Sequence, residues 1–224
     1  MEKGKTSRYL KYAIGEIILV VIGILIALQI NTWQTNNFNK RQENFYLKKL
    51  IQNIAQDTTY LGQRLRQLDS SASVLSKAEN AIYDTNIQNF PNDSVGLFLV
   101  SVYRFTPQKS TMDNLLATGK LDLIKDQALV DSLFVYYNDL NNYPEQINAS
   151  NELYSRGTFG PKLMEVPGGV FGLKKSELSV DESEFLLNMI QMKQHINSGL
   201  VGAYILAKSR ADHLLTIIEK NIDD

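Results

Sequence analysis

The sequence predicts a mainly α-helical protein, with an N-terminal transmembrane helix followed by a helical-bundle domain that contains two long antiparallel helices and a loop rich in glycine and proline. Three observations support this fold class. An apolar run lies near the N-terminus, two long stretches carry apolar residues at alternating steps of four and three, and glycine and proline gather in a segment between them. With 224 residues, the chain has room for one domain of ordinary size beyond the anchor.

The apolar run covers residues 13–30 and reads AIGEIILVVIGILIALQI. A helix of this length spans roughly 27 Å, which is about the hydrocarbon thickness of a thin bilayer. Trp33 beyond the run and Tyr9 and Tyr12 before it are aromatic residues of the kind that anchor a helix in the headgroup layers. We therefore expect a cytoplasmic tail at 1–11, a transmembrane anchor at 12–33 and an extracytoplasmic helical domain at 34–224.

The run is predicted to be an uncleaved anchor and not a cleaved signal. No Ala-x-Ala pattern follows it, and the chain has no cysteine that could carry a lipid. Basic residues in the tail place the N-terminus in the cytoplasm and the large domain across the membrane, by the positive-inside rule. Four basic residues that follow the run reduce this contrast: Lys40, Arg41, Lys48 and Lys49.

Composition and motifs argue against several classes of function. The net charge is −1 and the pI is about 6.2, without a strongly basic block outside the tail, so we expect no nucleic-acid binding. No hydrolase, phosphate-loop or dinucleotide signature occurs. His195 and His213 are roughly 27 Å apart along one helix, too far to share a metal ion. We therefore expect a protein that is not an enzyme, with no metal and no cofactor.

The first long helix beyond the anchor is predicted from a heptad seam. The seam consists of Leu47, Ile51, Ile54, Thr58, Leu61, Leu65, Leu68, Ala72 and Leu75. Because no proline occurs before Pro91, we expect the anchor to run directly into this helix. The seam is typical either of one helix in an intramolecular bundle or of a coiled coil between protomers. A matching seam later in the chain favours the bundle.

The second long helix is predicted over about 182–222. Its seam consists of Ile196, Leu200, Tyr204, Ala207, Ala211, Leu214 and Ile218. Two long helices with matching seams and shorter elements between them indicate an antiparallel pair. The C-terminus is then expected close to the membrane.

Shorter helices are expected between the two long ones. Pro91 and Asn92 open a helix over about 93–103, and Thr106 and Pro107 interrupt the chain after it. Next, a helix from an N-cap at Ser110 to a C-cap at Gly119 is predicted from the spacing of capping residues. Another begins after Asp126 and ends before Pro144, with a last short one to about Tyr154. We expect Tyr103, Phe105, Tyr136 and Tyr137 to pack in the core and not to form a ligand cage.

The segment 156–183 is rich in glycine and proline and reads as a turn or a small hairpin at Pro-Gly-Gly. A loop of this length in a helical domain is often functional. We therefore take Pro167, Gly168, Gly169 and Phe171 as a candidate contact loop.

A second candidate surface lies in the anchor. Glu16, Gly23 and Ala27 fall on one helix face, and Gly23 and Ala27 form a small-xxx-small step that permits close contact with another helix. A glutamate in an apolar span often marks a functional contact. Glu16 lies only about one turn inside the span, however, and the alternative is that its carboxylate reaches the headgroups.

Two stretches carry a family resemblance. Residues 12–17 (YAIGEI) with 23–31 (GILIALQIN), and residues 110–115 (STMDNL) with 119–124 (GKLDLI), resemble an uncharacterised family of single-pass membrane proteins from Bacteroidota, a domain of unknown function. The resemblance implies an inner-membrane anchor with an extracytoplasmic helical domain in a Gram-negative cell. It transfers no catalytic residue, because the family has no established activity.

Taken together, these features predict a membrane-anchored periplasmic protein that acts by binding. The first hypothesis is an interaction or accessory subunit of an envelope assembly, whose partners are the lipid bilayer and either another membrane protein or a second copy. The alternative is a ligand-sensing module that signals laterally through its transmembrane helix. A pocket lined by tyrosine and arginine favours the sensor, and a large exposed apolar patch favours the interaction subunit.

Overall fold

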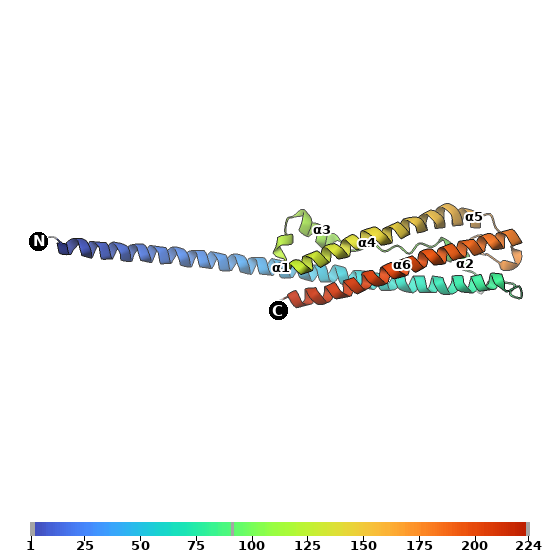
Figure 1. The fold of residues 1–224 in the computed structure, drawn as a ribbon, viewed down its shortest axis with the longest axis horizontal. Coiled ribbons are helices and arrows are strands. Elements are labelled where there is room, and N and C mark those ends of the chain that lie inside the picture. Colours follow the sequence, from blue (N-terminus) through green and yellow to red (C-terminus); the bar gives the residue numbers. More distant parts are fainter. Residues whose placement is uncertain (1–2, 91, 223–224) are drawn as a thin grey trace.

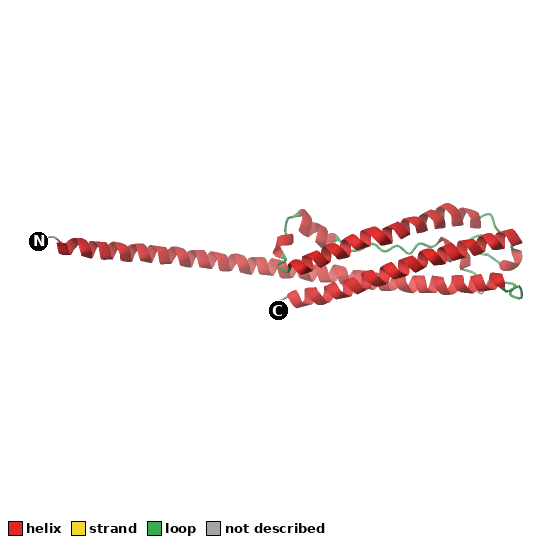
Figure 2. Ribbon diagram, in the orientation of Figure 1, coloured by secondary structure: helices red, strands yellow, loops and turns green. Residues whose placement is uncertain are grey.

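The computed structural model of the chain describes the backbone of residues 3–90 and 92–222, and the side chains of these residues except 3–11, 141 and 143. Within these ranges all regular structure is helical (Figures 1 and 2). The α-helices are α1 (Lys3–Tyr83), α2 (Val95–Val100), α3 (Ser110–Ala117), α4 (Gln127–Tyr154), α5 (Gly160–Leu163) and α6 (Val180–Asn221). Shorter turns are η1 (Leu121–Leu123), the π-helical η2 (Ser155–Phe159) and η3 (Lys175–Glu177). The predicted mainly α fold is confirmed.

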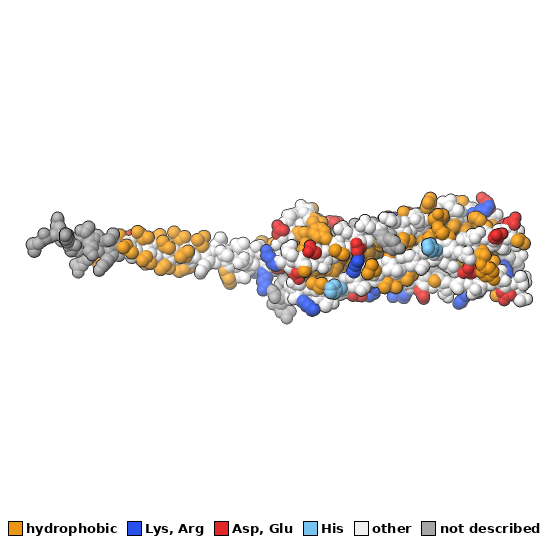
Figure 3. Space-filling view, in the orientation of Figure 1, with side chains coloured by type: hydrophobic (Ala, Val, Ile, Leu, Met, Phe, Trp, Pro, Cys, Tyr) orange, Lys and Arg blue, Asp and Glu red, His pale blue; other side chains and the backbone are white. Residues whose placement is uncertain are grey.

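Helix α1 runs without interruption from the predicted tail into the bundle (Figure 1). Its first half projects as a rod, and it is long and apolar enough to cross a membrane. Figure 3 shows apolar side chains covering this rod, then a polar neck before the bundle begins. The bundle starts near Glu43, whose carboxylate accepts a hydrogen bond from the Lys125 amide at 2.7 Å. Of the predicted tail, residues 1–2 and the side chains of 3–11 lie outside the described residues.

Helix α6 packs antiparallel to α1 along the bundle, as the matching seams predict. All seven predicted seam residues of α6 are buried. Its start is fixed by a capping box, in which Ser179 and Glu182 each accept from the other's backbone amide. The described chain ends at Ile222, beside the point where α1 enters the bundle (Figure 1).

The seam predicted for α1 is only half correct. Leu47, Ile54, Leu61, Leu68 and Leu75 are buried, whereas Ile51, Thr58 and Leu65 are partly exposed and Ala72 is exposed. The buried face turns instead toward Leu50, Asp57 and Ser71. Asp57 and Ser71 are polar, so a pattern of apolar residues does not predict that they are buried. Their burial depends on hydrogen bonds made inside the bundle.

Helix α4 continues through Pro144, so the predicted helix end before this residue is wrong. A proline in a helix removes one backbone hydrogen bond, but packing on both sides overrides this local preference. Leu140 and Asn148 flank the proline, and both are buried with it. The start of α4 is as predicted: Asp126 accepts from the Leu129 amide at 3.1 Å.

Helix α2 is shorter than the predicted helix over 93–103, whose opening residue Pro91 lies outside the described residues. The chain leaves the helix at Ser101 and runs extended to Lys109, and we call this segment (residues 101–109) the strap. Tyr103 and Phe105 point inward and are buried, whereas Arg104 and Thr106 are exposed. Figure 2 shows the strap passing between the long helices, where a four-helix bundle would have another helix.

The capping prediction for α3 is wrong at its start and right at its end. Lys109, not Ser110, is the N-cap residue, and the Thr111 amide donates instead to the Asn53 side chain on α1 at 3.4 Å. At the other end, Gly119 takes a φ of 63°, and the Lys120 amide donates to the Leu115 carbonyl at 2.9 Å. This is the Schellman arrangement that glycine permits.

The glycine- and proline-rich segment forms helical turns and loops, and no hairpin occurs in its described residues, so the predicted small hairpin is wrong. Gly168 and Gly169 have positive φ angles, which allow the turn. Val170 and Leu173 then bury against α2. There Gly96 permits close approach, since a Cβ atom on it would lie 2.5 Å from the Val170 carbonyl oxygen. The apolar anchors of this loop therefore fix it to the bundle.

Candidate functional site

The bundle core consists of two apolar clusters separated by a polar layer. The cluster nearer the projecting half of α1 reaches Leu68, and the distal cluster begins at Leu75. Between these levels, α1 contributes Ser71 and α6 contributes Lys193 and Asn197, all buried. The polar layer is defined by these three residues together with Ser101, Tyr103, Asn148, Asn151, Ser155 and Tyr204.

Lys193 is the charged group at the centre of the polar layer. It has no exposed surface, and its Nζ donates to the Asn151 Oδ1 at 2.5 Å, the Ser155 Oγ at 2.7 Å and the Ser101 carbonyl at 2.5 Å. Three acceptors match the three protons of an ammonium group. Burial lowers the pKa of Lys193 to about 7, because desolvation disfavours the charged form.

Tyr204 is the second centre of the polar layer. Its hydroxyl donates to the Tyr103 carbonyl at 2.9 Å and accepts from the Phe105 amide at 3.1 Å and the Asn148 amide group at 3.3 Å. Asn197 donates to Ser71 at 3.0 Å. Among the described buried side chains, the Asn148 Oδ1, Asn151 Nδ2 and Asn197 Oδ1 atoms have no hydrogen-bond partner.

Asp57 holds the C-terminal end of the strap, at Gln108. Its carboxylate has no exposed surface and accepts from the Gln108 amide at 2.9 Å and the Tyr136 hydroxyl at 3.0 Å. The Tyr137 hydroxyl donates to the Gln108 carbonyl at 3.1 Å. Burial raises the pKa of Asp57 to about 6, against the lowering effect of these two donors. Side chains from three helices thus replace a strand ladder for the strap.

The pairing of Lys193 with Ser155 has the composition of a base and a nucleophile, but its setting is structural. Neither side chain has exposed surface, and neither lines the grooves described below. Lys193 donates to the strap, to Asn151 and to Ser155, and the Ser155 hydroxyl donates to Asn151. Among the described residues, no group of three His, Cys, Asp or Glu side chains is placed to hold a metal ion. Lys193 and Ser155 are therefore enclosed, and the surfaces that the described bundle presents lie elsewhere.

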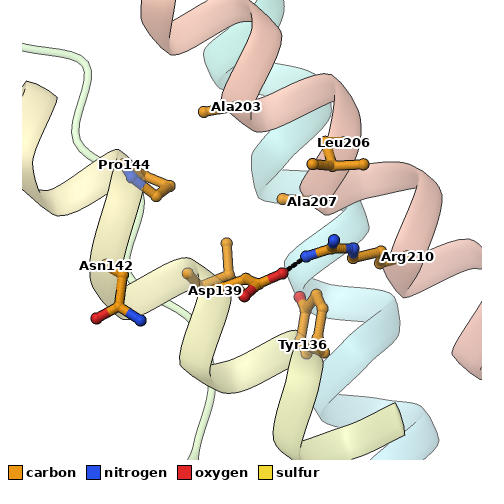
Figure 4. Close-up of a pocket in the computed structure, with 9 residues that line it drawn as sticks. Tyr136, Asp139, Asn142, Pro144, Ala203, Leu206, Ala207 and Arg210 are labelled. Atoms are coloured by element: carbon orange, nitrogen blue, oxygen red, sulfur yellow. Dashed lines mark ion pairs between the residues drawn. The ribbon is translucent and has the colours of Figure 1, made fainter.

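One such surface is a groove of about 260 Å³ between α4 and α6 (Figure 4). Small side chains of α6, Ala203 and Ala207, lie across it from Pro144. Arg210 forms an ion pair with Asp139 at its edge. The lining also includes Tyr136, Leu140, Asn142 and Leu206. This groove thus combines an apolar lining with one ion pair, a tyrosine and an amide.

The predicted face in the anchor lies on the projecting half of α1. Glu16, Gly23 and Ala27 are exposed there, and at 100° per residue they fall within roughly 40° of one another. A Cβ atom added to Gly23 meets nothing within 4 Å, so the surface of this face is open. The face ends at Ala27, 16 residues before Glu43, where the bundle starts.

The predicted contact loop lies at the other end of the molecule. Phe171 is 80% exposed, whereas its neighbour Val170 is buried. Pro167 and Gly168 are exposed and Gly169 is partly exposed. Met164, just before them, is 74% exposed. The loop therefore presents large apolar side chains on a backbone that is fixed to α2.

Sequence reasoning missed the polar layer and Asp57. The spacing carries a signal for both: continuing the α6 seam from Tyr204 and Leu200 toward the N-terminus, in steps of three and four, reaches Asn197 and Lys193. In the same way, Asp57 falls on the buried face of α1. The core aromatic residues, in contrast, are as predicted: Tyr103, Phe105, Tyr136 and Tyr137 are buried.

Comparison with known proteins gives one match. A model described as a family of unknown function (DUF6090) matches residues 16–154, more than half of the chain, and the chain belongs to this family. No curated protein and no solved structure matches the chain.

Proposed function

We propose that this member of the DUF6090 family is a single-pass inner-membrane protein of a Gram-negative, Bacteroidota-type cell, with its bundle in the periplasm. It acts by binding, as an interaction or accessory subunit of an envelope assembly, and not as an enzyme. The observation that carries the proposal is the continuity of α1 from Lys3 to Tyr83. One helix supplies both the anchor face and a side of the bundle, so a partner held in the membrane is linked rigidly to the bundle.

The surfaces of the bundle support a binding role. The contact loop exposes Phe171 and Met164 at the end farthest from the anchor, and large exposed apolar side chains on a fixed backbone are typical of protein contacts. The buried charged groups, Lys193 and Asp57, hold the strap in place. A partner in the envelope is therefore expected to contact the anchor face, the contact loop or both.

Affinity purification of the tagged chain from native membranes in mild detergent tests this function. A second membrane protein is expected in stoichiometric amount. Gly23→Leu is expected to remove it, because the larger side chain blocks close helix contact on the anchor face. Gly15→Leu is the matched control, since Gly15 is equally open but lies about 80° away around the helix. Recovery of the chain alone, or an equal effect of both variants, contradicts the proposal.

The groove in Figure 4 favours a second candidate function, ligand sensing. It brings Tyr136 and Arg210 together around an apolar lining of α4 and α6, which is the composition of many small-molecule sites. A ligand there would act on α6, and α6 packs along α1, so the signal would pass laterally through the anchor to a partner.

Mass spectrometry of small molecules released from the purified chain tests the sensor. An organic compound is expected with the wild-type chain and not with Ala207→Leu, which fills the groove, provided that the variant keeps its circular dichroism. The matched control is Ala128→Leu, at an exposed alanine of α4 that does not line this groove. If no compound is released, or the same compound is released from all three proteins, the sensor is excluded.

A further inference from the structure

The half of the heptad seam that α1 leaves unburied forms a second, outward-facing stripe. Its members are Ile51, Thr58, Leu65 and Ala72, which follow one another at seven-residue steps and which we call the outer stripe. Three are partly exposed and Ala72 is exposed. Between them lie the small residues Ala55 and Gly62, and a Cβ atom on Gly62 would have only the end of the Arg66 side chain within 4 Å. The stripe therefore allows another helix to approach closely.

A groove of about 480 Å³ runs beside the outer stripe, between α1 and α6. Leu65, Asp69 and Ala72 line it from α1, and Val201 and Ile205 line it from α6. Ile205 is 55% exposed although it is a large apolar residue. This groove differs from the one in Figure 4, which lies between α4 and α6.

A buried polar atom also lies below this groove. Asn197 lines it and is only 3% exposed, and its Oδ1 has no hydrogen-bond partner among the described residues. This atom is enclosed in the polar layer below the groove. The groove itself lacks an apolar cover, because Val201 is partly exposed and Ile205 is exposed.

We propose that α1 of a second copy of this chain occupies the groove, forming a parallel dimer with its two-fold axis along the membrane normal. Two copies in one bilayer are already parallel, and each carries the same stripe in the same register. A heptad repeat held over three heptads is the pattern by which parallel helices supercoil. The charges also match, because Arg66 and Asp69 flank the stripe and form no ion pair within the described residues. A two-fold axis would bring Arg66 of one copy near Asp69 of the other, and both side chains are exposed.

The neck and the anchor continue the same repeat. Seven-residue steps back from Ile51 reach Asn44, Asn37 and Ile30, and then Gly23 and Glu16. Asparagine at such a position fixes the register of a parallel pair. The inference covers the bundle and the neck, and it goes beyond the proposed function, which assigns the anchor face to another membrane protein. The bundle part stands independently of that function.

Cysteine cross-linking tests the dimer, because the chain has no cysteine of its own. Single variants Thr58→Cys, Leu65→Cys and Ala72→Cys are oxidised in native membranes with copper phenanthroline and resolved without reductant. Matched controls are Gln56→Cys, Gln63→Cys and Ser70→Cys, each two residues earlier, exposed and about 200° around the helix. We expect a species of twice the chain mass for the stripe variants, in at least fivefold excess over the controls, since a disulfide needs Cβ atoms within about 4.5 Å.

Equal yields from stripe and control variants, absence of the double-mass species, or cross-links to a different protein overturn the proposal. A charge exchange gives a second readout. Arg66→Glu is expected to lower the Leu65→Cys yield severalfold, and Asp69→Arg added to it is expected to restore the yield. Failure of this restoration contradicts the two-fold pairing of these residues. Purification of a second envelope protein does not depend on these yields, so the dimer and the proposed function can fail separately.

Discussion

Tyr204 and Tyr103 are joined by a hydrogen bond of 2.9 Å from the hydroxyl of the first to the backbone carbonyl of the second, inside the bundle. The same hydroxyl accepts from the Phe105 amide at 3.1 Å, so one α6 side chain serves two backbone groups of the strap. An extended segment inside a helical bundle has no strand neighbour, and its backbone groups need other partners. Side chains of α1, α4 and α6 provide them.

Removal of the Tyr204 hydroxyl is expected to destabilise the bundle. Tyr204→Phe leaves the Tyr103 carbonyl and the Phe105 amide without their partner in a buried setting, at a cost of roughly 1–3 kcal/mol for each group. Chemical denaturation of the detergent-solubilised chain measures the change. Tyr60→Phe is the control, because Tyr60 is 38% exposed, and it is expected to change the free energy of unfolding by less than about 0.5 kcal/mol. Equal effects of the two variants would show that the strap is not held in this way.

Lys193 is expected to make stability rise with pH above neutrality. Its pKa is about 7 in the folded chain and 10.5 in the unfolded chain, so between these values the unfolded state binds the additional proton. The free energy of unfolding then increases with pH by up to roughly 1.4 kcal/mol per pH unit. Lys193→Met is expected to lack this increase. Denaturation of both proteins at pH 7 and pH 9 compares the slopes, and parallel slopes would contradict the assignment.

Asp57 is expected to make the free energy of unfolding fall as the pH rises in the acidic range. Its pKa is raised from 3.8 to about 6, so the folded state binds the additional proton between these values. The stabilisation that protonated Asp57 contributes is complete below pH 3.8 and is lost as the pH rises through about 6. Asp57→Asn cannot titrate, so from pH 4 to pH 7 the wild type is expected to lose stability relative to this variant. A constant difference between the two denaturation curves over that range would refute this.

Alanine substitutions at Gly96 and Gly202 are expected to have opposite effects on the stability of the structure around them. In Gly96→Ala the new Cβ meets the Val170 backbone at 2.5–3.0 Å, so the contact loop is expected to shift and to exchange its amide hydrogens faster. In Gly202→Ala the Cβ meets nothing within 4 Å, and the helix is expected to gain about 0.5–1 kcal/mol. Hydrogen exchange over residues 164–173 and thermal unfolding measure these effects. Unchanged exchange in Gly96→Ala would show that the loop is not held against α2.

The apolar pattern predicts the long helices well, because their packing depends on regular spacing. All seven seam residues of α6 and the alternate positions Leu47 to Leu75 of α1 are buried. It fails where tertiary contacts override local preference. Pro144 stays inside α4 because the residues around it are buried against α6, and Ser110 gives up its capping role because Asn53 of α1 accepts from the next amide.

The candidate sites also differ in whether regular spacing in the sequence predicts them. The anchor face could be read from the sequence, since it needs only helix periodicity. Lys193 and Asp57 could not be read from an apolar count, because their burial depends on hydrogen bonds to the strap. The groove between α1 and α6 could not be predicted from an apolar count either. There, residues predicted as core lie at the surface, and a count of apolar positions does not distinguish an inner face from an outer one.

The mass of the complex that the full chain forms in native membranes tests the proposed binding role most directly. It is measured by native mass spectrometry after purification of the tagged chain in mild detergent. The account predicts a complex that holds two copies of the chain of 25.4 kDa together with a stoichiometric second protein. A single chain at 25.4 kDa, with no second copy and no other protein, would contradict it.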